Sequence, residues 1–233
     1  MRALIFAAGR GERMRPLTDT MPKPLLDVAG KPLIVHHLEH LAAVGVHYVV
    51  INTSHLAGQF PATLGDGSRW GLRIRYAYEG DEPLETGGGM LHAMPLLGDE
   101  PFLAINGDVY TDFDFAVLPT EPAALAHLVL ADNPAHHPQG DFHLAADGHA
   151  SDTTQAERLT FAGIGIYRPR LLDDWRDIIG NAPGADAEPP RFKLAPILRA
   201  AMAHGQVTGE HFRGRWSDVG TPERLVALNQ SSD

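Results

Sequence analysis

Short apolar runs alternate with amphipathic stretches through the first half of the chain. Apolar or alternating runs predict strands at 2–8, 47–52, 72–78 and 102–106. A 3.6-residue spacing and flanking glycines predict helices at 32–44, 56–64, 87–94 and 113–118. This alternation indicates an α/β, Rossmann-like fold, with a mixed, mostly parallel sheet flanked by helices. Ligands should then bind at the carboxyl ends of the strands.

The pattern changes after residue 120. Strands are predicted at 126–131, 141–145, 159–167 and 206–212, and helices at 193–204 and 222–229. Asp147-Gly148 is typical of a hairpin turn, so we expect a small antiparallel lobe beside the sheet. Residues 181–190 are rich in proline and glycine and predict a loop. A single domain over 1–233 accounts for the whole pattern.

The loop after the first strand has the composition of a polyphosphate site. Gly9 and Gly11 leave room for a ligand to approach the backbone, and prolines stiffen the segment. Four cations follow closely, at Arg10, Arg13, Arg15 and Lys23. The dinucleotide fingerprint is excluded because Met14 replaces its third glycine, and the Gly-Lys-Ser/Thr of a P-loop is absent.

The amino-acid composition excludes several classes of binding partner. The formal net charge of −10 argues against nucleic acid and anionic membranes as partners. Cysteine is absent, which excludes disulfides and thiolate chemistry. No basic leader and no membrane-spanning apolar window is evident, so we expect a cytoplasmic protein.

The segment G-x-G-x-R-x-R-P-L-T followed by P-K-P resembles the signature of the sugar-phosphate nucleotidyltransferases, and the resemblance extends over essentially the whole chain. It implies an enzyme that joins an NTP and a sugar 1-phosphate into an NDP-sugar and pyrophosphate. By this resemblance Arg15 contacts the leaving pyrophosphate, and Lys23 contacts the α-phosphate and the sugar phosphate. Residues 1–120 would form the nucleotide half and 121–233 the sugar-phosphate half. The nucleotide-binding residues of the loop would be Ala8, Gly9, Gly11, Glu12 and Arg13.

The segment L-E-T-G-G-G at 84–89 matches the nucleoside pocket of that family. Its glycines would let a flat base or sugar reach the backbone, so Thr86, Gly87 and Gly88 are candidate contacts. Glu79 or Glu85 would accept the imide N–H of uracil. The aspartates of I-N-G-D and W-S-D-V-G-T, Asp108 and Asp218, match metal ligands in the family and suit Mg²⁺, which prefers carboxylate, phosphate and water oxygens.

Candidate contacts to the sugar phosphate lie mainly in the second half. The resemblance points to Asn106, Gly140, Glu157, Gly163 and Lys193. Many relatives carry Glu-x-Lys before the Phe-x-Gly segment, but here Arg158 follows Glu157 and the lysine is missing. The phosphate contact therefore shifts to Lys193, whose charge opposes the dipole of the helix it begins.

The sequence leaves several sugar 1-phosphates as possible substrates. The segments LETGGG, GDF, FKLAP and DVGT resemble members that use UTP and N-acetylmuramate 1-phosphate in peptidoglycan recycling. Mannose, glucose or heptose 1-phosphate with UTP or GTP are alternatives. A glycosyltransferase with Asp112-Phe113-Asp114 as its metal motif, and a non-catalytic nucleotide-sugar-binding protein, are more remote ones.

Overall fold

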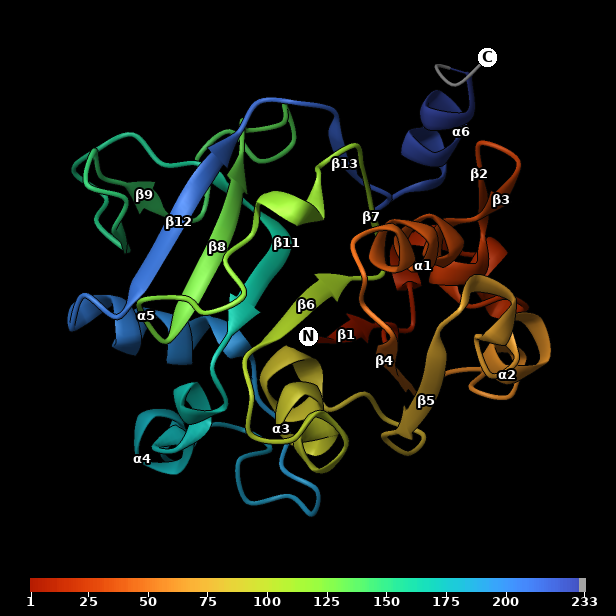
Figure 1. The fold of residues 1–233 in the computed structure, drawn as a ribbon, viewed down its shortest axis with the longest axis horizontal. Helices are drawn as coiled ribbons and strands as arrows, with labels where there is room; N and C mark the ends of the chain where they lie inside the picture. Colours follow the sequence, from red (N-terminus) through yellow and green to blue (C-terminus); the bar gives the residue numbers. More distant parts are fainter. Residues whose placement is uncertain (231–233) are drawn as a thin grey trace.

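A mixed sheet of seven strands forms the centre of the computed structural model, which describes residues 1–230 (Figure 1). From one edge to the other its strands are β12 (Val207–Phe212), β8 (Ala126–Ala131), β11 (Thr160–Tyr167), β6 (Phe102–Asn106), β1 (Arg2–Phe6), β4 (Tyr48–Thr53) and β5 (Arg73–Tyr78). Only β11 runs antiparallel to its neighbours β6 and β8; the other pairs are parallel. The predicted mixed, mostly parallel sheet is confirmed.

Alternating residues of the buried strands supply two cores, one on each face of the sheet. Ala3 and Ile5 of β1 pack with the residues of α1, whereas Leu4 packs on the opposite face with α3 and α5. Figure 1 shows α3, α4 and α5 gathered on one side, with α1 and α2 on the other. The helices are α1 (Leu33–Ala43), α2 (Gln59–Leu64), α3 (Glu85–Leu97), α4 (Trp175–Ile179), α5 (Leu194–Ala203) and α6 (Pro222–Gln230).

The second half differs in detail from the expected lobe. Strands β8 and β11 are largely buried and β12 is mostly half-buried. All three extend the main sheet, which leaves the antiparallel part as the hairpin of β9 (His143–Leu144) and β10 (Ala150–Ser151). The predicted 113–118 helix is only a 3-10 turn at Phe115–Val117, capped by the Asp114 carboxylate. Two further pairs were not predicted: β2 (Asp27–Val28) with β3 (Lys31–Pro32), and β7 (Val109–Thr111) with β13 (Trp216–Asp218).

The carboxyl ends of β1, β4 and β6 meet at one edge of the sheet. In register, Phe6 at the end of β1 lies between Asn52 of β4 and Asn106 of β6. The Ala7 N–H donates to Asn52 Oδ1 (2.6 Å), and the Gly107 N–H donates to the Phe6 carbonyl (2.9 Å). These bonds fix where the loops leave the sheet. No helix within residues 1–230 combines the length and apolar composition needed to cross a bilayer.

Candidate active site

A cavity of about 680 Å³ opens at these strand ends. The first loop forms one wall, and the whole stretch from Phe6 to Met14 lines it. The predicted nucleotide-binding residues Ala8, Gly9, Gly11, Glu12 and Arg13 all belong to this wall. The cavity is also lined by residues from other segments, namely Lys23, Glu79, Glu85, Thr86, Asn106, Asp108 and Arg191. The structure therefore brings the glycine-rich loop and the I-N-G-D segment into one site.

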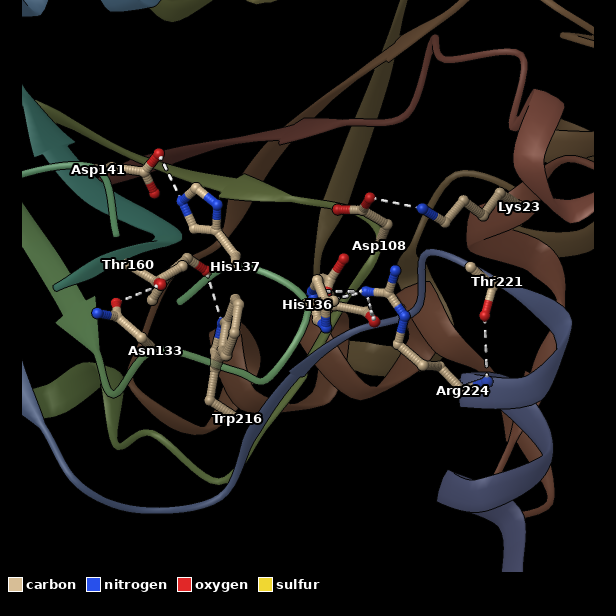
Figure 2. Close-up of polar contacts among 12 residues, drawn as sticks. Lys23, Asp108, Asn133, His136, His137, Asp141, Thr160, Trp216, Thr221 and Arg224 are labelled. Carbon is tan, nitrogen blue, oxygen red and sulfur yellow. Dashed lines mark hydrogen bonds and ion pairs between the residues drawn. The ribbon is translucent and has the colours of Figure 1, made fainter. Parts of the chain in front are cut away.

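Lys23 is the buried cation of this cavity. Its residue surface is only 9% exposed, and its Nζ lies 2.6 Å from Asp108 Oδ2 (Figure 2). A buried ammonium needs a nearby anion to offset its lost hydration, and Asp108 provides one. Because an ammonium has three donors, Lys23 keeps capacity for a phosphate oxygen beside the carboxylate.

Arg15 lies elsewhere. It is not among the residues that line the cavity, and its Nε pairs with Asp19 Oδ1 at 3.2 Å on the surface. Arg10 and Arg13 of the same loop do line the cavity. The loop thus presents two arginines to the site and turns the one singled out by the resemblance toward a neighbouring carboxylate.

Glu79 is buried in a hydrogen-bond network at the back of the cavity. Its Oε1 accepts from the Asn52 amide (2.5 Å) and its Oε2 from the Leu84 N–H (2.8 Å). Burial raises the pKa of Glu79 to about 7, although both hydrogen bonds oppose the shift. Glu85, in contrast, is exposed on the rim, with Arg191 Nη2 3.8 Å from its carboxylate.

The glycines of 87–89 pack against the protein itself. A Cβ on Gly87 would lie 2.5 Å from the Phe192 ring, and one on Gly88 would lie 2.4 Å from the Pro190 carbonyl. The N–H groups of Gly87 and Gly88 both donate to the Phe192 carbonyl. Residues 190–193 therefore lie beside the backbone that a flat base was expected to approach, and neither Gly87 nor Gly88 lines the cavity. Thr86 does line the cavity.

Asp108 and Asp218 are brought close together by the β7–β13 pair. Asp218 lies opposite Val109 in the ladder, and the Val219 N–H donates to the Asp108 carbonyl (2.7 Å). The Asp218 carboxylate pairs with Arg224 and lies 3.1 Å from His136 Nε2; Figure 2 shows Arg224 beside His136. Residues 1–230 hold no cluster of three metal-ligating side chains. The protein offers a pair of carboxylates, which suits an ion that takes its other ligands from phosphate and water.

A second cavity of about 180 Å³ adjoins the first, with which it shares Phe6, Thr86 and Asn106. Gly163 lines it at a bulge of β11, where φ is +72° and a Cβ would lie 2.6 Å from the Asn106 amide. Of the other sugar-phosphate candidates, Gly140, Glu157 and Lys193 line neither cavity. Lys193 is exposed at the start of α5, so the shift of the phosphate contact to Lys193 gains no support.

Several lining residues escaped the sequence reasoning. Asn52 and Arg191 line the larger cavity and Arg199 the smaller one. The position of Asn52 at the end of a parallel strand was the available signal. Asp112 and Asp114, the glycosyltransferase alternative, line a different cavity beside α1 and accept backbone N–H groups of Arg215 and Ala116.

Residues 2–150 match the model of the nucleotidyl transferase family, and the chain therefore belongs to that family. An N-acetylmuramate alpha-1-phosphate uridylyltransferase of Neisseria meningitidis is 49% identical over 231 residues, which cover 97% of this chain and 95% of the relative. The protein of the same description from Caulobacter vibrioides is 35% identical, with 97% and 94% covered. A Bacillus anthracis structure, provisionally named a glucose-1-phosphate thymidylyltransferase, shares the fold with a TM-score of 0.83 at 21% identity, covering 100% and 95%.

Proposed function

We propose that this protein transfers the uridylyl group of UTP to N-acetylmuramate 1-phosphate, giving UDP-N-acetylmuramate and pyrophosphate in peptidoglycan recycling. The observation that carries the substrate assignment is 49% identity, across nearly the full length of both chains, with a relative of that activity by name. Two adjoining cavities support a reaction that joins a nucleotide to a sugar phosphate: the larger gathers four basic side chains as well as five carboxylates, and the smaller is mostly apolar.

The triphosphate occupies the larger cavity and the sugar the smaller, so their reacting phosphates meet near the shared residue Asn106. An oxygen of the sugar phosphate attacks the α-phosphorus of UTP and forms a new P–O bond. The bond from the α-phosphorus to the bridging oxygen breaks, and its electron pair leaves with pyrophosphate. The phosphate monoester is already a competent nucleophile, so catalysis is positioning and charge neutralisation.

Lys23 supplies the charge nearest to the reacting phosphates, while Arg10 and Arg13 bind the outer phosphates. Arg15 reaches the departing pyrophosphate by leaving Asp19, since a surface ion pair contributes only about 0–1 kcal/mol. The ionised carboxylate of Glu79 accepts a hydrogen bond from the imide N–H of the base. Gly87 and Gly88 act indirectly, because they let residues 190–193 pack against the start of α3.

Asp108 and Asp218 are the residues that would hold Mg²⁺. Bound there, the ion would neutralise phosphate charge and stabilise the leaving pyrophosphate. The donor set fits, because the carboxylates of Asp108, just before β7, and Asp218, in the neighbouring β13, leave the remaining positions to phosphate and water oxygens. Both carboxylates are paired with cations, so Lys23 and Arg224 keep the two acidic groups from repelling each other.

The test is Mg²⁺-dependent pyrophosphate release, with UTP and GTP each offered against N-acetylmuramate, glucose, mannose and heptose 1-phosphates. Release only with UTP and N-acetylmuramate 1-phosphate is the expected result. Release with another pair would keep the reaction and discard the substrate. Tight nucleotide binding without release from any pair would favour the non-catalytic alternative.

A further inference from the structure

The smaller cavity has one cation among its lining residues in the described part of the chain. Its walls are largely apolar, with aromatic rings from Phe142, Phe161 and Tyr167. The polar groups are Thr86, Asn106, Asp141 and a single cation, Arg199 of α5. If the sugar itself carried no charge, the substrate would need a cation only at its 1-phosphate group, which in the proposed arrangement faces the larger cavity.

Arg199 is held in place from one side. Its Nε lies 2.8 Å from Asp152 Oδ2, while the other oxygen of Asp152 is 2.9 Å from Arg158 Nη2. One carboxylate therefore serves two guanidinium groups and leaves a net positive charge. The Arg199 side chain is 49% exposed, and within residues 1–230 its ion-pair partner is Asp152, which leaves Nη1 and Nη2 open to solvent and to a ligand. These two nitrogens form the edge that binds a carboxylate in bidentate geometry.

The acidic residue of the cavity does not neutralise Arg199. The Asp141 carboxylate accepts the Phe161 N–H through Oδ2 (2.8 Å), and its Oδ1 lies 3.1 Å from His137 Nε2 (Figure 2). Both oxygens are thus directed at β11 and the 133–140 loop. Arg199 remains available to an anion that enters the cavity.

We propose that Arg199 binds the lactyl carboxylate of the sugar substrate, an inference that rests on the proposed function. N-acetylmuramate differs from N-acetylglucosamine by a lactyl ether, which adds one carboxylate that is ionised at neutral pH. An anion in a largely apolar cavity is costly unless it is paired. A guanidinium fixed through Nε and open at Nη1 and Nη2 provides that pairing, so Arg199 determines selectivity for a sugar that carries an acid.

The test compares two proteins, each assayed with two substrates. The parent and Arg199→Gln are each assayed with N-acetylmuramate 1-phosphate and with its lactyl carboxamide, which has the same shape without the charge. We expect the parent to prefer the acid by 10- to 100-fold in kcat/KM, mainly through KM, and the variant to lose most of that preference. Arg199→Lys should restore part of it. Arg170→Gln, which removes an exposed arginine near Asp173, is the matched control and should keep the parent's preference.

Two other results would overturn the inference. Equal losses on acid and amide would show that Arg199 only supports the fold, and an unchanged preference would show that the carboxylate binds elsewhere. In both cases the parent still uses N-acetylmuramate 1-phosphate, so the proposed function stands. A parent that accepts neither substrate but turns over another sugar phosphate would overturn the proposed function together with the subsite.

Discussion

The two cavities share three lining residues but differ in the number of their charged side chains and in the elements that build them. Arg10, Arg13, Lys23 and Arg191 line the larger one, whereas Arg199 is the cation of the smaller one in the described chain. The larger is built from loops that follow parallel strands, and the smaller from the bulged antiparallel strand β11 and helix α5. A polyphosphate needs several cations, while a sugar needs shape and one charge. Changes in the larger cavity should therefore affect the chemistry, and changes in the smaller cavity the choice of sugar.

The largest effect is expected from Lys23, in the wall that serves the reacting phosphates. Lys23→Ala removes the cation nearest Asp108 and should lower kcat/KM with UTP by about 10²–10³-fold, because charge developing on the phosphates loses its buried partner. Asp108→Ala should cause a loss of similar size. The measurement is steady-state pyrophosphate release, with circular dichroism to verify folding.

Lys31→Ala is the matched control, since Lys31 pairs with Glu39 away from both cavities. It should keep near-parent activity. Near-parent turnover in both Lys23→Ala and Asp108→Ala would contradict the assignment of the reacting centre to the larger cavity.

Glu79 should give the chain an unusual dependence of stability on pH. Its pKa is raised by burial from 4.5 to about 7, so the folded state holds the proton more tightly than the unfolded state. The resulting stability is fully present below pH 4.5 and is lost as the pH rises through 7. By linkage this amounts to about 3 kcal/mol. Between pH 5 and 8, Glu79→Gln should therefore gain stability relative to the parent in urea unfolding.

Glu85→Gln is the control for that measurement, because Glu85 is an exposed carboxylate of the same cavity. A parallel pH dependence for Glu79→Gln and the parent would mean that Glu79 is ionised throughout. Saturating UTP should shrink the difference at pH 7, since an imide donor favours the ionised carboxylate.

A substitution at Gly163 tests the role of Asn106, which lines both cavities. Gly163→Ala places a Cβ 2.6 Å from the Asn106 amide at a φ of +72°, so it should displace Asn106 and cost about 1–3 kcal/mol of stability. Gly71→Ala has nearly the same φ, +71°, but open space around the Cβ, and isolates the backbone strain. We expect KM for the sugar 1-phosphate to rise in Gly163→Ala alone, and equal kinetics in the two variants would argue against a role for Asn106.

The sequence predicted the parallel sheet and the glycine-rich wall because those features follow from local patterns. The strand ending in Asn106 and the loop from Ala8 to Arg13 are contiguous in sequence, so periodicity and spacing locate them. The packing of Phe192 on Gly87 and the place of Arg199 depend on residues about one hundred positions apart. No local pattern encodes such contacts. For this reason the sequence predicted neither the packing of residues 190–193 on Gly87 and Gly88 nor the cation of the smaller cavity.

For Arg15 the sequence resemblance and the structure disagree: the resemblance predicts a contact with pyrophosphate, whereas the structure pairs Arg15 with Asp19. Substituting each partner in turn tests which of the two roles Arg15 has. If Arg15 leaves Asp19 to bind pyrophosphate, Arg15→Gln should lower kcat/KM by about tenfold, the value of one charged hydrogen bond. Asp19→Asn frees the same guanidinium and should leave kcat/KM unchanged or slightly raised. If Arg15 serves only to pair with Asp19, the two variants remove the same interaction and must behave alike. Pyrophosphate release at subsaturating UTP separates these outcomes, and it decides whether the larger cavity recruits a fifth cation during the reaction.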